Sequence, residues 1–384
     1  MRISLLAIAT FALVICALPV CVAYARDNQA QDKPMSAPTK ITELRVIDYN
    51  LWHGLNPTSL TRFGEFETAE VREKRLQGFL QYARRIDPHV IFLQEVNPVH
   101  SLSQRIADEL GMTRVYQVGN SGLKIGSVGL PTNLFSGLAI LAKPELGLKD
   151  LGGRKISGGF GITSRWFSFQ THEFRYSHAA RITVNGRPVL LLNTHLHHGP
   201  EVTREVREVL DRLVNENKIT HQRREEVVAT INHASARRMD ELKATLTLAT
   251  DADLDSAPTL FAGDFNASPD APELMWLKTV QHFHSSTDEV EDDESTWMYT
   301  WDYQRNPNTH TIDEFVPVNT FEPVIQEPIH ATQIGESRRL DYIFVRNAEG
   351  FLTRAESGLF ANEPYEGVLP SDHFGLFAVF AVGE

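Results

Sequence analysis

Residues 259–266 read TLFAGDFN: an apolar run from Thr259 to Gly263 ends on Asp264, and Asn266 follows two positions later. A short run that is apolar throughout predicts a strand buried on both of its faces. The same arrangement, an apolar strand with a polar residue at one end, occurs at four more places. In these, Asn50 follows LRVIDY, Glu95 follows VIFLQ, His195 follows VLLLNT, and the pair Asp372-His373 precedes FGLFAVF.

The recurrence of polar strand ends indicates a functional site. A single Asn, Asp or His at the end of a strand usually hydrogen-bonds a turn and carries no further meaning. In a layered α/β fold, however, strand ends at one edge converge on a crevice where ligands bind. A cluster of carboxylate and amide oxygens there suits Mg²⁺, with Mn²⁺ and Ca²⁺ as the alternatives.

Strands and helices alternate through most of the remaining chain. Apolar runs at 137–142 and 340–345 predict further strands, and amphipathic stretches at 71–86 and 102–110 predict helices. We therefore expect helices on both sides of a layered β core.

Two longer segments depart from this alternation. Residues 201–249 are highly charged, with Arg, Glu, Leu and Val at helical spacing, which predicts one or two solvent-facing helices inserted into the fold. Residues 282–338 show little periodicity and include an acidic run at 288–294, which predicts a loop-rich segment with a functional role.

The N-terminus has the features of a secretory signal. Arg2 precedes an apolar run from Leu5 to Val22, and the small residues of Ala23-Tyr24-Ala25 offer a cleavage site. This predicts a signal peptide at 1–25, a flexible leader at 26–42 and a secreted or periplasmic protein. An uncleaved membrane anchor is the alternative interpretation. Both cysteines, Cys16 and Cys21, lie in the segment expected to be removed, so disulfides would not stabilise the exported protein.

Composition and charge narrow the classes of function. The 384 residues are 42% hydrophobic and 22% charged, which is ordinary for a globular protein and excludes a disordered or fibrous chain. Acidic residues outnumber basic ones by 49 to 37, for a formal charge of −12. An acidic surface repels polyanions, so nucleic acid is disfavoured as a partner unless a local basic groove or bound cations intervene.

Six fragments of the chain are similar to motifs of the endonuclease/exonuclease/phosphatase superfamily, in the same order. They are YNLWHG (49–54), IFLQEV (91–96), NTHLHH (193–198), AGDFNASPD (262–270), RLDYIFV (339–345) and PSDHFGL (370–376). The resemblance implies a deoxyribonuclease I-like fold over residues 43–384: a four-layered α/β sandwich with two central mixed sheets. It also implies a divalent metal, most simply Mg²⁺, at the shared edge of the sheets.

The resemblance assigns a role to each matching residue. Asn50, Glu95 and Asp372 match positions at the metal, with Glu95 as the main ligand. Asp264 and Asn266 match the pair that orients the attacking water and the scissile phosphate. His195 matches a donor to a phosphoryl oxygen, His373 matches the general acid/base, and Asp341 matches the carboxylate that fixes the His373 tautomer. These roles agree with hydrolysis of a phosphate ester, because attack on phosphorus develops negative charge that a cation and histidine donors stabilise.

Three departures from the common motifs limit the resemblance. His197 stands where related exported proteins often have an acid, and we expect it to cap its loop rather than to bind metal. Asp48 stands where a small hydroxyl residue is frequent, and it either touches the site or faces the sheet edge. The Cys-Asp-Arg signature of inositol phosphatases is missing at RLDYIFV (339–345), which disfavours an inositide substrate.

The substrate is the open question, and three functions remain. The first is an exported phosphodiesterase or phosphomonoesterase, acting as a monomer on a lipid or another small phosphate ester. The second is a secreted endonuclease, and the third is a non-catalytic binding module with the same fold. Phe160, Trp166, Phe167 and Phe169 follow two glycines and would suit a loop in peripheral contact with a membrane, or alternatively belong to the core.

Overall fold

A computed structural model describes residues 40–126, 128–164, 166–287, 298–311, 320–333 and 335–383. The predicted signal peptide (1–25), nearly all of the predicted leader (26–42) and the acidic run at 288–294 lie outside the described residues. Lys40–Glu384 form a compact unit of their own.

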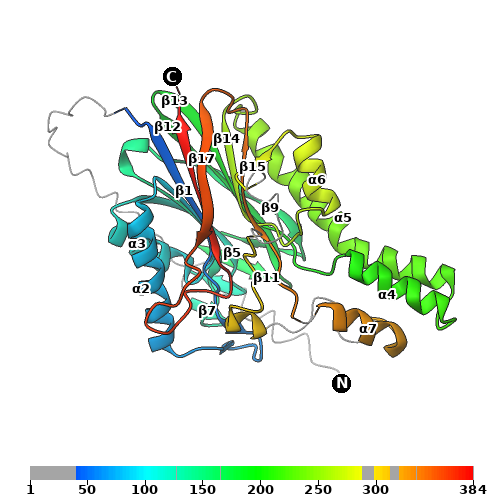
Figure 1. The fold of residues 1–384 in the computed structure, drawn as a ribbon. Coiled ribbons are helices and arrows are strands. Elements are labelled where there is room, and N and C mark those ends of the chain that lie inside the picture. The colour runs from blue at the N-terminus through cyan, green and yellow to red at the C-terminus, as the bar shows by residue number, and fades with distance from the viewer. Residues whose placement is uncertain are drawn as a thin grey trace, which may run out of the picture. The chain divides into compact units, whose positions relative to one another are not determined.

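Two six-stranded sheets form the centre of this unit (Figure 1). In the first, the order β17-β18-β1-β4-β8-β5 pairs β1 with β4 in parallel and the other neighbours antiparallel. In the second, the order β15-β16-β14-β13-β12-β9 pairs β13 with β14 in parallel. The strands of the first sheet are β1 (Glu43–Asn50), β4 (Val90–Val96), β5 (Thr113–Asn120), β8 (Ser136–Ala142), β17 (Leu352–Phe360) and β18 (Gly375–Val382). Those of the second are β9 (Lys149–Gly158), β12 (Phe174–Val184), β13 (Arg187–His195), β14 (Thr259–Asp264), β15 (His284–Ser285) and β16 (Asp341–Arg346).

The sheets pack face to face, and helices cover their outer faces (Figure 1). Side chains such as Phe92 and Leu260 form the apolar layer between the sheets. The helices α2 (Ala69–Ile86) and α3 (Val99–Leu110) pack on the first sheet, and α5 (His221–Asp251) and α6 (Pro272–Thr279) pack on the second. Burial on both faces explains why β4, β13 and β14 are almost wholly apolar. The predicted four-layered sandwich is confirmed.

The charged segment 201–249 forms two helices, α4 (Arg204–Asn215) and α5, but it is not merely a solvated surface. Each helix begins at a threonine, Thr203 or Thr220, whose hydroxyl accepts a backbone N–H of the first turn. On α5, Arg238 and Glu241 are fully buried, because this helix covers the second sheet. The expectation of solvent-facing helices is therefore wrong for this part of α5.

The predicted loop-rich segment 282–338 contains one helix, α7 (Pro323–Gln333), within the described residues. It packs with α4 and the start of α5 in a small separate core formed by Val206, Leu210, Ile231, Ile325 and Ile329. The 3₁₀ turns η1 (Pro144–Leu146) and η3 (Pro307–Thr311) complete the helical elements described. No helix in the described ranges has the length and apolar composition needed to cross a bilayer.

Two small sheets connect the larger elements. Strands β2 (Leu55–Asn56) and β3 (Gly64–Glu65) form a short ribbon after β1. A four-stranded sheet has the order β10-β11-β6-β7. Its strands β6 (Leu123–Ile125) and β7 (Val128–Leu130) lie in the connection from β5 to β8, and β10 (Gly161–Thr163) and β11 (Phe167–Gln170) lie in the connection from β9 to β12.

Candidate active site

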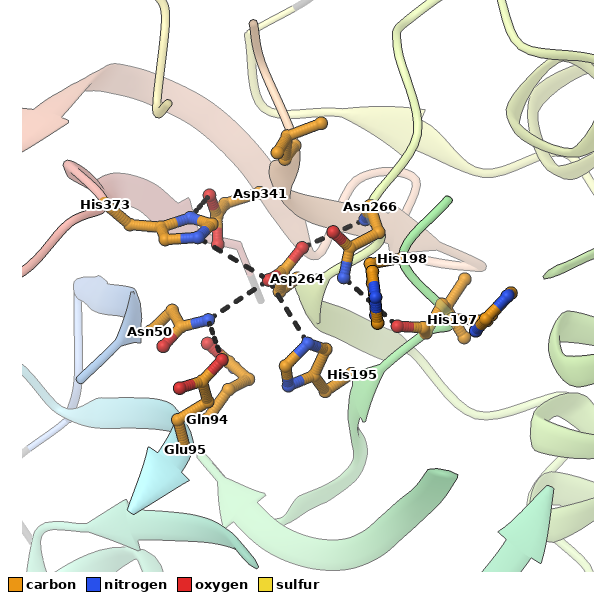
Figure 2. A network of polar contacts seen from close by, with 12 residues as sticks. Asn50, Gln94, Glu95, His195, His197, His198, Asp264, Asn266, Asp341 and His373 are labelled. Atoms are coloured by element: carbon orange, nitrogen blue, oxygen red, sulfur yellow. Dashed lines mark hydrogen bonds and ion pairs between the residues drawn. The ribbon is translucent and has the colours of Figure 1, made fainter. Parts of the chain in front are cut away.

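The polar strand ends meet in one pocket at a shared edge of the two large sheets (Figure 2). Parallel pairing of β1 with β4, and of β13 with β14, brings Asn50, Glu95, His195 and Asp264 to the same edge. Asp341 opens the antiparallel strand β16 directly opposite Asp264. The pocket has a volume of about 540 Å³. Glu95, His195, Asp264, Asn266, Asp372 and His373 all line it.

A β-bulge in β4 turns Glu95 toward the pocket. The register between β4 and β8 shifts between Leu93 and Val96, and Glu95 has a φ of 52°, in the left-handed region. Gln94 therefore points inward between the sheets, where it donates to Asp48 at 2.8 Å, while Glu95 points outward. A non-glycine residue in this conformation costs free energy, and such outliers concentrate at functional sites.

His373 and Asp341 form a buried pair. Nδ1 of His373 lies 2.7 Å from Oδ2 of Asp341, which leaves Nε2 facing the pocket, 3.8 Å from Oδ2 of Asp264. Burial by itself would lower the pKa of His373, but the Asp341 and Asp264 carboxylates outweigh burial and hold this pKa well above its usual value. The ring of Trp301 packs edge-on against the imidazole, with the centroids 5.1 Å apart. The imidazole thus has a fixed orientation, with Nε2 directed toward Asp264 and the pocket.

Asn50 links the carboxylates of the two sheets. Its Nδ2 donates to Oδ2 of Asp264 at 3.1 Å and to Oε1 of Glu95 at 3.3 Å, while its Oδ1 accepts the Trp52 N–H at 2.9 Å. His195 Nε2 lies 3.5 Å from the same Oδ2 of Asp264. Burial, and then the Asp341 carboxylate, raise the pKa of Asp264 to about 7.

The donor set fits a divalent cation. Glu95, Asp264 and Asp372 bring three buried or largely buried carboxylates to one pocket, and the pKa of Asp372 rises to about 6 because the group is buried. A hard cation would stabilise these carboxylates. Asn50 presents its Nδ2 to them, so as a ligand it would have to turn its amide and release the Trp52 N–H.

A second combination of side chains, which shares Asp264 with the first, is less suited to a metal. Asp264, Asp341 and His373 place ligand atoms within 4.8 Å of one another. Asp341 already accepts a hydrogen bond from the imidazole, and a protonated imidazole cannot be a ligand. Glu95, whose Oε2 accepts the His53 N–H at 3.0 Å, is therefore the better anchor.

Arg175 and His198 are pocket residues that the sequence patterns did not identify. Arg175, on β12, is buried, and its guanidinium lies 2.9 Å from Nδ1 of His198 and 2.9 Å from Oε1 of Glu173. The Nε of Arg175 has no hydrogen-bond partner. The only signal in the sequence is an arginine at the start of an otherwise largely uncharged strand.

The structure corrects the expectation for His197 and decides between the two alternatives for Asp48. His197 does not cap its loop: its backbone N–H donates to Glu241 at 2.7 Å, while Nδ1 of its ring is buried without a hydrogen-bond partner. Its ring lies away from Asp264 (Figure 2). Asp48 lies under the pocket between the sheets, where Gln94 joins it to Asn193.

Comparisons with known proteins agree with this architecture. The family model described as Endonuclease/Exonuclease/phosphatase family matches residues 49–373. None of the curated protein sequences compared with the chain matches it.

Several solved structures share the fold. A humanized D. rerio TDP2 with 14 mutations has 18% identity and a TM-score of 0.52, with 89% of this chain and 100% of that chain covered. D. rerio TDP2 complexed with a single strand DNA product has 18% identity, a TM-score of 0.51 and the same coverage. An endonuclease/exonuclease/phosphatase from Bacteroides vulgatus has 13% identity and a TM-score of 0.52, again covering 89% and 100%. Identities this low show a common fold and nothing finer.

Proposed function

The chain belongs to the Endonuclease/Exonuclease/phosphatase family, and we propose that it is an exported, divalent-metal-dependent hydrolase of phosphate esters, acting on a lipid or another small phosphodiester. One observation carries the proposal: a carboxylate-oriented imidazole, a second histidine and three further carboxylates converge in a single pocket. Such a set contains an acid/base, anion donors and metal ligands, which are the groups that phosphate ester hydrolysis needs.

The roles that the family resemblance implies are compatible with the geometry of the pocket. Nε2 of His373 faces the pocket because Asp341 holds Nδ1, so it is placed to exchange a proton with water or with the leaving oxygen. His195 donates to a phosphoryl oxygen, and Asp264 with Asn266 orients the water. Glu95, with Asn50 and Asp372, would hold the cation. When bound, the cation would withdraw negative charge from the phosphoryl oxygens.

The pocket lining supports a small or lipid-borne ester over a nucleic acid. Arg175 is the one Lys or Arg among the described residues that line the pocket, whereas Trp52, Phe66, Phe174, Tyr176 and Trp301 provide aromatic surface. A polynucleotide needs several cations along its track, and the chain has a formal charge of −12. Nucleic acid is the second candidate, because a structural neighbour, TDP2, was solved with a single strand DNA product.

The test of the proposal is the Glu95→Gln variant. Hydrolysis of bis-p-nitrophenyl phosphate should be abolished in this variant and in the wild type with EDTA, because the cation loses its anionic ligand. Mn²⁺ binding measured by calorimetry should weaken in parallel. Glu109→Gln, which removes the same charge from a surface pair with Arg84, is the matched control and should bind Mn²⁺ and turn over normally.

Three outcomes would count against the proposal. Full activity in EDTA would exclude a metal from the mechanism. A fully active Glu95→Gln variant would exclude Glu95 as its ligand. Mn²⁺ binding by a folded protein with no turnover on this diester, sphingomyelin, inositol phosphates or plasmid DNA would favour the binding module. Efficient cleavage of plasmid DNA alone would move the endonuclease to first place.

Export is a separate part of the proposal, supported by the apolar run Leu5–Val22 and the small residues before Arg26. The protein recovered outside the cytoplasm should begin at Arg26 and contain no cysteine. N-terminal sequencing tests this. A chain that starts at Met1 and stays in the membrane fraction would favour the anchor instead.

A further inference from the structure

The small sheet β10-β11-β6-β7, which we name the outer sheet, exposes an unusual amount of apolar surface. Nine of the fourteen large apolar side chains that are exposed in the described part of the chain lie in residues 123–130 and 160–169. Trp166 is 80% exposed, Phe160 79% and Val128 78%. Isolated exposed apolar residues are normal, but a contiguous group of them marks an interaction surface.

The outer sheet is inverted with respect to polarity. Along its strands the buried positions are polar, namely Lys124, Thr163 and Ser168, and the alternate positions are apolar and exposed. The inner groups have partners that keep this orientation: Lys124 Nζ donates to the Pro131 carbonyl, and Ser168 Oγ donates to the Gly122 carbonyl at 2.8 Å. Since successive strand residues face opposite sides, these bonds hold the apolar side chains outward.

Strand pairing makes the exposed side chains contiguous. Ile162 lies opposite Phe169, Phe167 opposite Ile125, and Ile125 opposite Val128. At the edge of the group the rings of Phe160 and Phe169 meet edge to face, with their centroids 6.3 Å apart. The result is one apolar surface across four strands, with an indole at the turn between two of them.

The outer sheet is also free of acidic residues. The sequences 121–135 and 159–172, which form it, contain no Asp or Glu, although the whole chain carries 49. Binding to a soluble protein or to a second copy of this chain does not require a surface without acidic residues. Insertion into a lipid bilayer does require it, because a carboxylate carried into the headgroup layer would lose part of its hydration, whereas aromatic side chains partition into that layer.

The connections of the outer sheet lead directly to the pocket. Asn120 and Ser136, which flank β6 and β7, line the pocket, and so do Glu173 and Phe174, which follow β11. A surface that holds this sheet would therefore lie at the pocket mouth.

We infer that the outer sheet is a docking surface for a zwitterionic lipid bilayer, inserted by its aromatic and aliphatic side chains next to the pocket. The inference rests on the proposed function only in taking that pocket as catalytic. Insertion of apolar side chains, rather than charge, provides the attraction, because Lys124, the one Lys or Arg among the described residues of the outer sheet, is buried and paired. Binding should therefore depend only weakly on salt.

The test uses residues 40–384, which form a compact unit with both large sheets and omit the apolar run Leu5–Val22. Co-sedimentation with phosphatidylcholine vesicles in EDTA measures binding without turnover. Val128→Glu should abolish binding, and Trp166→Ala and Phe160→Ala should each weaken it by roughly tenfold. Val280→Glu, at a 55% exposed position on the far end of α6, is the matched control and should bind as the wild type does.

Activity on a soluble chromogenic diester, measured separately, distinguishes the two proposals. All four variants should keep this soluble activity, since none of them changes the polar residues that line the pocket. If the wild type does not hydrolyse the diester but still binds vesicles, only the proposed function fails. Wild-type protein that stays in the supernatant would overturn the inference. So would equal loss in Val280→Glu, or binding confined to anionic vesicles and removed by salt. Concentration-dependent dimers that Val128→Glu dissociates would assign the surface to a second copy instead.

Discussion

At the scale of single residues, the pair His373–Asp341 determines how protons move in the pocket. His373→Ala should lower kcat on the chromogenic diester by a factor on the order of 10²–10⁴, the usual contribution of a positioned acid or base. Asp341→Asn should also be impaired, because the amide no longer stabilises the same imidazole tautomer. Removing the carboxylate should also lower the pKa of His373, so the pH profile of kcat should shift to lower pH.

A second histidine–aspartate pair, in which only the histidine is buried, provides the control for this prediction. Nε2 of His178 lies 2.9 Å from Oδ1 of Asp150, a comparable contact outside the pocket. His178→Asn should therefore affect folding stability but leave kcat near normal. Near-normal kcat in both His373→Ala and Asp341→Asn, at saturating substrate and metal, would remove the first pair from the chemistry.

Arg175 is expected to bind the substrate phosphate. Its buried guanidinium lies beside His198, and its unpaired Nε would otherwise pay an uncompensated desolvation cost. Arg175→Met should lower kcat/KM roughly 10- to 100-fold, the value of a charge-assisted hydrogen bond, and should weaken inhibition by inorganic phosphate. Arg175→Lys should recover only part of the loss, because lysine lacks the planar fork.

Arg114→Met is the matched control, since Arg114 stacks on Tyr116 of β5 and does not line the pocket. If phosphate inhibition is unchanged in Arg175→Met, the arginine acts only through His198 and Glu173.

At the scale of elements, a buried ion triad joins the long helix α5 to α6 and to the loop before α4. Arg238 is fully buried between Glu273 and Glu201, with its guanidinium 3.1 Å from Oε1 of Glu201. Arg238→Met should destabilise the protein by about 3–5 kcal/mol, because two carboxylates are left buried without a counter-charge. Urea unfolding measures this difference.

Arg223 on the same helix is the comparison, since it forms an exposed pair with Glu322. Arg223→Met should change the unfolding free energy far less, because water screens that pair. If both substitutions changed the unfolding free energy equally, the burial of Arg238 would contribute nothing to stability.

The elements themselves were predictable to different degrees. The central strands of the two large sheets could be predicted because burial on both faces requires apolar runs, as in β13 and β14. Strands β9 and β17 are only partly buried and have no such run, so the sequence did not reveal them. The outer sheet could not be predicted, since its strands β6, β7 and β10 are only three residues long. Their apolar side chains also face the solvent instead of the core. Helix α7 escaped prediction because Pro328 lies inside it, where a proline normally ends a helix.

At the scale of the whole molecule, the convergence of the polar strand ends could be predicted, but the geometry of the pocket could not. Asn50, Glu95 and Asp264 follow apolar strands, and the parallel order of those strands brings their ends together. The bulge that turns Glu95 outward depends on pairing between β4 and β8, which the local sequence does not encode. Arg175 reaches the pocket from β12 only because the two sheets pack face to face.

Part of the stability of the whole molecule should be lost in acid, and His89 provides a test of the cause. Nδ1 of His89 accepts the Arg45 N–H at 3.1 Å, and burial, with Lys143 and Arg45 nearby, lowers its pKa to about 4. Between pH 6.5 and 4 the unfolded chain binds a proton at this residue and the folded chain does not, so stability is lost as pH falls. His195, His197 and His198 have lowered pKa values as well and contribute with the same sign. His373, Asp264 and Asp372 have raised pKa values and contribute with the opposite sign.

His89→Asn keeps an acceptor for the Arg45 N–H but cannot titrate, so it isolates the contribution of His89 to the pH dependence of stability. The loss of unfolding free energy between pH 7 and pH 5 should be smaller in this variant than in the wild type by about 1–2 kcal/mol. Urea unfolding of both proteins at the two pH values measures it. An unchanged pH dependence in His89→Asn would show that Nδ1 of His89 takes up a proton without unfolding, which the bond to Arg45 should prevent.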